Sequence, residues 1–266
     1  MAEHPYIFTN SQEVSELERL QAIEQIFDSA THKQIQATGI SQNWCCLEVG
    51  AGAGSIMRWM SSIVGEGGKV VAVDLDTRFI ENIHLANVEI LKADIRQLQL
   101  EENSFDLIHA RYVLIHISDY ESTLSKMIAL LKPGGWIVIE EPDFSAARAI
   151  AGSEAACQAV NRVNRAIFKT FKSRKMDYDL GIKLPALFQK LGLELQSVEN
   201  NSPLSNGSSG VARMMKMSAL QLLEKYIATG EATQKDIEQY CLFAEDQTAW
   251  AIYYATVGVT AQKVIS

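Results

Sequence analysis

The chain is poor in cysteine, and its cysteines are not arranged for a metal or a disulfide framework. The four thiols form no C-x-x-C pair and lie in no Cys/His cluster; they are Cys45, Cys46, Cys157 and Cys241. Such cysteines are typical of buried, reduced thiols in the cytoplasm. The sequence therefore predicts a cytoplasmic protein with no metal site.

Long hydrophobic runs and an excess of positive charge are also absent. The longest apolar stretches, such as AWAIYYATVGV, are much shorter than the roughly 20 residues that span a bilayer. The N-terminus has no basic start followed by an apolar core, so no secretory signal is expected. With 24 Lys and Arg against 32 Asp and Glu, the net charge of -8 argues against a general nucleic-acid or membrane-surface binder.

What the sequence has is an alternation of short apolar runs and helical stretches between residues 44 and 142. The predicted helices are 54–64, 77–85 and 119–131, and the predicted strands are 45–49, 69–74, 88–92, 105–110 and 136–140. These strands are apolar throughout, which indicates a sheet covered on both faces. The alternation predicts a parallel α/β sheet with right-handed crossovers.

The rest of the chain is predominantly helical, with two further strands. Helical spacing covers residues 10–39, 153–173, 182–191 and 211–245, whereas 193–199 and 249–262 read as strands. The stretch 200–210, NNSPLSNGSSG, is typical of a loop. The length of 266 residues fits one large domain or a core with a smaller addition.

A glycine-rich turn follows the first predicted strand of the core. Gly50, Gly52 and Gly54 lie at alternate positions between that strand and a helix. Glycine allows a sharp turn and lets a ligand approach the backbone, and the helix start offers free N–H groups. Ligands of open α/β sheets bind at this end of the strands. Taken alone, the turn is also compatible with tight packing of small residues.

Two acids at later strand ends narrow the ligand class. Asp74 closes the second strand, 24 residues after Gly50, where a carboxylate can accept both hydroxyls of a ribose. That feature fits NAD as well as other adenosine ligands. The dinucleotide pattern, however, requires glycine or alanine where Ser55 stands, and here the spacing is E-x-G-x-G-x-G from Glu48. A third acid, Asp94, closes the third strand and is placed for an exocyclic amino group.

Five motifs in order resemble the strand ends of class I S-adenosylmethionine-dependent methyltransferases. They are LEVGAGAG, VVAVDLD, LKADI, FDLIHARYVLIHI and LLKPGGWIVIEEPD. The resemblance is strong over residues 40–142 and follows only the general pattern over 182–200 and 248–262. It implies a Rossmann-like, doubly wound α/β sheet of seven strands with the last one antiparallel, carrying helical lid additions. It also implies S-adenosylmethionine as the cofactor.

The resemblance assigns cofactor-binding roles to residues along this edge. Glu48 would steer the loop and the methionine amino end, and Asp74 would hold the ribose. Arg111 would lie near the methionine portion, where the family often has a smaller residue, so an ion pair with a nearby acid is an alternative. The full implied set is Glu48, Gly50, Ala51, Gly52, Asp74, Leu75, Asp94, Ile95 and Arg111.

Three residues are candidates for contact with the methyl acceptor. His116 follows the fourth strand towards the cleft and is the best candidate for a general base; a packing role is the alternative. Glu140 and Glu141 end the fifth strand, where they would orient the acceptor or else pair with Arg111 or water. His109 is disfavoured because it falls within a strand.

The expected layout is a core with helical additions over the cleft. Residues 1–40 form an N-terminal helical lid, 41–142 the cofactor-binding core and 143–181 a helical insert over the active site. Residues 182–266 complete the sheet, with a helical insert at about 205–247. Such a roof favours a small-molecule acceptor methylated at oxygen, nitrogen or carbon. The oligomeric state stays open, with a homodimer as one option.

Three other functions are compatible with the sequence. They are a NAD-dependent oxidoreductase, a same-fold enzyme that uses the bound sulfonium for a rearrangement or cyclisation, and a non-catalytic binding module. Ser55 and Asp94 disfavour the first. The cationic side chains of 153–173 predict either a docking face for an anion or, preferentially, a solvated helix face.

Overall fold

The computed structural model describes residue 8 and residues 13–265 of the chain, which divides into two compact units. The sheet unit comprises Phe27–Glu141, Gly181–Glu199 and Val257–Ser266. The helical unit comprises Met1–Ile26, Pro142–Leu180 and Asn200–Thr256. Residues 1–7 and 9–12 of the predicted N-terminal segment 1–40 lie outside the described part. Helix α1 (Glu13–Ala37) contributes its first half to the helical unit and its second half to the sheet unit.

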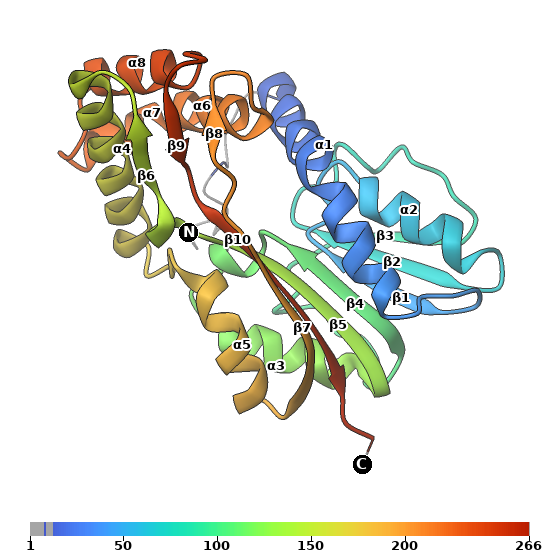
Figure 1. Ribbon diagram of the computed structural model, residues 1–266. Helices are drawn as coiled ribbons and strands as arrows, with labels where there is room; N and C mark the ends of the chain where they lie inside the picture. Colours follow the sequence, from blue (N-terminus) through green and yellow to red (C-terminus); the bar gives the residue numbers. More distant parts are fainter. Residues whose placement is uncertain (1–7, 9–12, 266) are drawn as a thin grey trace. The chain divides into compact units, whose positions relative to one another are not determined.

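A seven-stranded mixed sheet with a Rossmann-like strand order forms the sheet unit. Its order is β3-β2-β1-β4-β5-β10-β7, and the last strand is antiparallel, as predicted (Figure 1). The strands are β1 (Cys45–Val49), β2 (Lys69–Asp74), β3 (Val88–Lys92), β4 (Phe105–Arg111), β5 (Leu131–Asp143), β7 (Leu193–Asn201) and β10 (Ala255–Lys263). The order reverses at β1 and β4, so the carboxyl ends of these two neighbours border the crevice where such sheets bind ligands.

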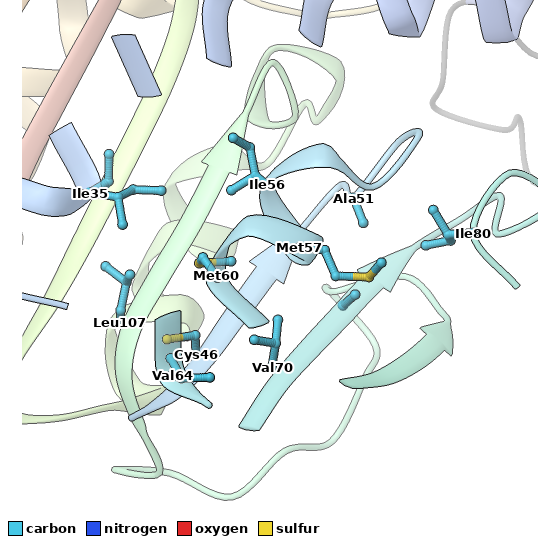
Figure 2. Packing of buried hydrophobic residues seen from close by; sticks show 12 residues of the cluster. Ile35, Cys46, Ala51, Ile56, Met57, Met60, Val64, Val70, Ile80 and Leu107 are labelled. Atoms are coloured by element: carbon cyan, nitrogen blue, oxygen red, sulfur yellow. The ribbon is translucent and has the colours of Figure 1, made fainter. Parts of the chain in front are cut away.

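Helix α2 (Ser55–Val64) covers one face of this sheet because its apolar residues recur at helical spacing. Figure 2 shows Ile56, Met57, Met60 and Val64 packed with Ile35 of α1 against strand residues Cys46, Val70 and Leu107. Successive strand side chains face opposite sides of a sheet. Residues two positions beyond Cys46, Leu107 and Val138 therefore point to this same face, and they are Glu48, His109 and Glu140.

Two further helices belong to the sheet unit, and the helical unit has its own elements. Helices α3 (Tyr120–Leu130) and α5 (Leu180–Lys190) complete the sheet unit. The helical unit contains α4 (Glu154–Ser173), α6 (Gly210–Gln221), α7 (Leu223–Ala228) and α8 (Gln234–Phe243), with a small antiparallel sheet of β6 (Arg148–Ala151), β9 (Trp250–Ile252) and β8 (Ser205–Asn206). Among the described helices, none has the length and hydropathy of a membrane span.

The basic residues of α4 pair with acids inside the helical unit. Arg162 bonds to Asp236 at 2.7 Å, and Arg165 and Lys169 both reach Glu231, at 3.0 and 2.7 Å. Three of the cationic side chains predicted as a possible docking face for an anion are therefore already paired with acids of the protein. The interpretation of this side of α4 as a solvated helix face is therefore the better one. Its cations also form ion pairs with Glu231 and Asp236.

Four expectations for individual elements are wrong. The predicted helix 77–85 is a series of turns. Only the 13 residues 75–87 lie between β2 and β3, and so short a segment is not held helical by its own hydrogen bonds alone. The helical stretch 211–245 is three helices, and the predicted loop 200–210 contains the end of β7 and all of β8. The final strand 249–262 divides at Tyr253 and Tyr254 into β9 and β10, which belong to different sheets.

Candidate active site

The glycine-rich turn after β1 is held tightly by the strands beside it. Gly50 has φ +75 and donates its N–H to the Val73 carbonyl at 2.7 Å. A Cβ at Gly50 would lie 2.3 Å from Val113 Cγ2, in the segment that follows β4. Gly54, at φ +88, starts α2 in the left-handed conformation. The glycine pattern predicts that a ligand lies against Gly50, whereas on the Cβ side of Gly50 the structure places the Val113 side chain.

Asp74 connects this turn to the end of β2. Its Oδ2 accepts the Gly52 N–H and its Oδ1 accepts the Asp76 N–H, each at 2.9 Å. Burial raises the pKa of Asp74, and these amide hydrogen bonds oppose the shift. Leu75 is half-buried next to it, and Ala51 is buried in the turn. Each carboxylate oxygen has a further lone pair, so Asp74 has acceptor capacity left for two hydroxyl groups.

Asp94 and Ile95 follow β3 at the same edge of the sheet. The Asp94 carboxylate bonds to the Arg96 guanidinium through both oxygens, at 2.6 to 3.0 Å, and to the Arg96 amide. The hydrogen bonds from Arg96 lower the pKa of Asp94, which stays ionised. Ile95 is buried. The predicted role of Asp94 and Ile95 at an adenine edge stays a prediction, and Arg96 is a partner that the sequence analysis did not include.

The guanidinium of Arg111, at the end of β4, finds its hydrogen-bond partners on helix α1. Its guanidinium bonds to Asp28 Oδ1 at 2.9 Å and to Thr31 Oγ1 at 2.8 Å. The nearby acid is thus Asp28, not an acid of the EEPD segment. Burial works against the charged form of Arg111, but the charges of Glu140 and Asp28 outweigh it and raise its pKa. A direct role of Arg111 at the cofactor stays a prediction.

His109, which the sequence analysis disfavoured, is the centre of a buried polar cluster. Its Nδ1 lies 2.8 Å from Glu48 Oε2, and its Nε2 lies 3.2 Å from Glu140 Oε2. Glu140 also accepts the Thr31 hydroxyl at 2.5 Å and the Gln34 amide at 3.3 Å. Strand alternation was the signal available in the sequence, since it places Glu48, His109 and Glu140 on one face of three adjacent strands.

Glu141 faces the opposite side of β5 and has a backbone-positioning role. Its carboxylate accepts the N–H groups of three consecutive residues, Val113, Leu114 and Ile115, at 2.7 to 3.2 Å. Burial raises the pKa of Glu141 to about 8, against the effect of these three bonds. His116 ends the same short 3₁₀ helix (Leu114–His116) and is half-buried. Glu141 thus positions the segment that carries His116, whose role as a base stays a prediction.

Replacing Glu141 with alanine is expected to destabilise the protein by roughly 3 kcal/mol or more, because a buried donor without a partner costs about 1–3 kcal/mol and three would be left. Urea denaturation would measure this. Asp143→Ala is the matched control, since Asp143 is the next acid along the chain and accepts a single amide, from Ser145. A loss for Glu141→Ala no larger than that of the control would contradict the positioning role.

No metal-binding arrangement appears in the part of the chain that the structure describes. Its histidine, cysteine and acidic side chains form no group of three or more placed to hold a metal ion. What the site offers is a glycine-rich backbone turn, acidic side chains at several strand ends and the start of a helix. That combination suits an organic ligand with hydroxyl and amino groups.

Comparison with known proteins points to one kind of domain. The family described as "Methyltransferase domain" matches residues 47–139. The ubiquinone/menaquinone biosynthesis C-methyltransferase UbiE of Cronobacter sakazakii is 31% identical over 115 residues, which are 40% of this chain and 46% of that protein. The chain thus spans about half the length of this relative. Methyltransferase str2 of Strobilurus tenacellus is 27% identical over 236 residues, 81% of this chain and 82% of that protein.

Solved structures agree on the fold. The phosphoethanolamine N-methyltransferase 2 of Haemonchus contortus, solved with phosphomonomethylethanolamine and S-adenosylhomocysteine, superposes with a TM-score of 0.59 at 20% sequence identity. The superposition covers 92% of this chain and 57% of the other. At that identity the likeness concerns the fold alone. The matched domain, residues 47–139, contains the turn after β1, Asp74, Asp94, His109 and Arg111.

Proposed function

We propose that this chain, a class I S-adenosylmethionine-dependent methyltransferase by its matched domain and its fold, methylates a small metabolite at oxygen, nitrogen or carbon. The observation that supports this most is the turn after β1, locked to the Asp74 carboxylate through the Gly52 amide. It joins backbone donors and a carboxylate at the edge of the sheet where nucleotide-like ligands bind. The cofactor is S-adenosylmethionine.

The residues present fit an adenosyl ligand with an amino acid tail. Asp74 has lone pairs free for two ribose hydroxyls, with Leu75 beside it to pack on a base. Asp94 and Ile95 are proposed at the adenine edge. Gly50, Ala51 and Gly52 are proposed to lie against the ligand, and Glu48 is proposed to bind the ammonium group at its methionine end. Arg111 is proposed near that end, acting together with Asp28.

When bound, S-adenosylmethionine supplies a methyl group activated by a sulfonium charge. Displacement at such a methyl needs little covalent help, so the chain acts mainly by aligning the acceptor and excluding water. An oxygen or nitrogen acceptor also has a proton to lose, and His116 is the proposed base. Glu140 and Glu141 are proposed to act from the end of β5, and the hydrogen bonds of both point to positioning.

The class of methyl acceptor is supported only by the names of similar proteins and by composition. The UbiE relative is named for C-methylation in ubiquinone and menaquinone biosynthesis, and the structural neighbour is named for N-methylation of phosphoethanolamine. Both names concern small molecules, methylated at carbon in the first case and at nitrogen in the second, so the names support a small acceptor without selecting the atom. The acidic composition and the cysteine usage support a cytoplasmic enzyme that does not bind nucleic acid.

The helical lid is also part of the proposal. Its segments are residues 1–40, 143–181 and about 205–247, and their place over the active site stays a prediction.

The direct test is incubation of the protein with host metabolite extract and S-adenosylmethionine carrying a trideuterated methyl group, followed by mass spectrometry. The proposal expects one metabolite to acquire the intact labelled methyl as S-adenosylhomocysteine accumulates. Conversion of a metabolite without loss of label from the cofactor would instead support a rearrangement or cyclisation. Calorimetric binding of NADH without binding of S-adenosylmethionine would favour the oxidoreductase.

A further inference from the structure

Three adjacent strands place a histidine between two carboxylates in the interior of the sheet unit. In the register of β1 and β4, Glu48 stands opposite His109, and both face the side covered by α1 and α2. The imidazole uses both ring nitrogens, one for Glu48 and one for Glu140. All three side chains are at most 4% exposed, so water does not compete for these bonds. An imidazole with an acceptor at each nitrogen is favoured in its doubly protonated, cationic form.

Helix α1 completes the cluster around Glu140. Thr31 donates to Glu140 and accepts from Arg111, which in turn pairs with Asp28. These bonds occupy both oxygens of Glu140. Glu48 differs, because His109 bonds its Oε2 and no donor among the described residues reaches its Oε1. One carboxylate oxygen, on the strand that leads into the glycine turn, is therefore left for a ligand.

The charges of the cluster do not cancel. With Glu48 ionised, the cluster carries three negative charges, from Asp28, Glu48 and Glu140, against two positive ones from His109 and Arg111. Among the described residues, three other titratable groups face the cluster. Tyr112 acts on Arg111 and Cys46 on Glu48. His32, stacked on Trp59 at 4.2 Å, is the third, and burial lowers its pKa so that it stays neutral. One unbalanced negative charge in a buried setting is costly unless a cation offsets it. The ammonium group of an amino acid ligand is such a cation.

We propose that His109 is a positioning residue: its imidazolium holds Glu48 ionised and fixes Glu48 Oε1 for the ammonium group of the cofactor. This rests on the proposed function, in which Glu48 binds the methionine end. Glu140, which Thr31 and Gln34 hold in place, bonds the imidazolium from the other side. His109 therefore acts on the ligand through Glu48, without touching the ligand.

The electrostatics agree with this geometry. Burial alone lowers the pKa of His109, but the Glu48 charge and the bonds to both carboxylates outweigh it and raise the pKa to about 9. Burial raises the pKa of Glu48, and His109 is the largest influence against that shift. If the imidazolium is lost, the opposition to burial weakens, and the Glu48 carboxyl takes up a proton at higher pH than before. A ligand ammonium then has to displace that proton.

The test is calorimetric titration of S-adenosylmethionine into wild type and His109→Gln at pH 7, in two buffers of different ionisation enthalpy. We expect wild type to bind without net proton release. The variant should release about one proton on binding and bind about tenfold more weakly, and the loss should grow as the pH falls. Thr31→Val is the matched control, because it removes bonds within the cluster but leaves both His109 contacts in place. It should show no proton release.

A measurement on wild type keeps the proposal testable if His109→Gln does not fold. In the ¹⁵N NMR spectrum of the ligand-free protein, both ring nitrogens of His109 should be protonated at pH 7 and lose a proton near pH 9. A neutral His109 at pH 7, or a folded variant that binds without releasing a proton, would overturn the inference. Wild type that binds no S-adenosylmethionine would instead overturn the proposed function.

Discussion

Asp74→Ala is expected to weaken the binding of S-adenosylmethionine by about 100-fold. The carboxylate would accept two ribose hydroxyls, and a hydrogen bond to a charged group contributes about 1.5–3 kcal/mol, so losing two costs roughly 3 kcal/mol. The substitution also releases the Gly52 amide, which Asp74 holds at 2.9 Å, so the turn itself loosens. Isothermal titration calorimetry measures the affinity directly.

A matched control separates this effect from a general change of charge at the site. Asp76 is two residues away, is partly exposed and pairs with Arg78 at 2.9 Å. Asp76→Ala removes one negative charge but keeps the Asp76 backbone amide that donates to Asp74. We expect it to bind within about threefold of wild type. Unchanged affinity in Asp74→Ala would show that the ligand does not use the end of β2.

Gly50→Ala is expected to abolish measurable cofactor binding and to lower the free energy of unfolding by about 2–5 kcal/mol. The left-handed backbone at φ +75 costs an alanine roughly 1–2 kcal/mol. The new Cβ would also lie 2.3 Å from Val113 Cγ2, and such overpacking costs about 1–3 kcal/mol. Thermal denaturation and calorimetry would measure the two effects.

Gly39 provides the control, because it has nearly the same backbone conformation without the contact. Its φ is +79, and no atom lies within 4 Å of the position that a Cβ would take. Gly39→Ala should therefore show the backbone cost alone, and the double variant Gly50→Ala/Val113→Ala should recover the packing part. Equal destabilisation by Gly39→Ala and Gly50→Ala would contradict the packing of Val113 on the turn.

The inner strands β1, β2 and β4 could be predicted from the sequence because they are mostly apolar and buried, whereas the edge strands β3 and β7 are more exposed. That pattern also located Asp74 and Asp94 at strand ends. The helix predicted at 77–85 failed because apolar spacing alone does not stabilise a short connection. The short strands β6, β8 and β9 could not be predicted, since two to four residues carry no periodicity and depend on their partners for pairing.

In the candidate site, too, the sequence did not reveal which side chains become partners. His109 was set aside because it lies inside a strand, yet that location makes it the partner of Glu48 and Glu140 on neighbouring strands. Arg111 pairs with Asp28, which is 83 residues earlier in the chain and belongs to a helix. Partners so distant in sequence are brought together only by the folded sheet, so residue type and spacing do not reveal them.

The central claim is that the turn after β1 and the Asp74 carboxylate together bind the adenosyl part of S-adenosylmethionine. A crystal structure of the protein grown with S-adenosylhomocysteine tests it most directly. The account predicts ribose hydroxyls at Asp74, the ligand backbone along Gly50–Gly52 and the amino group at Glu48 Oε1. Ligand density elsewhere in the molecule, with none at the ends of β1 and β2, would contradict it.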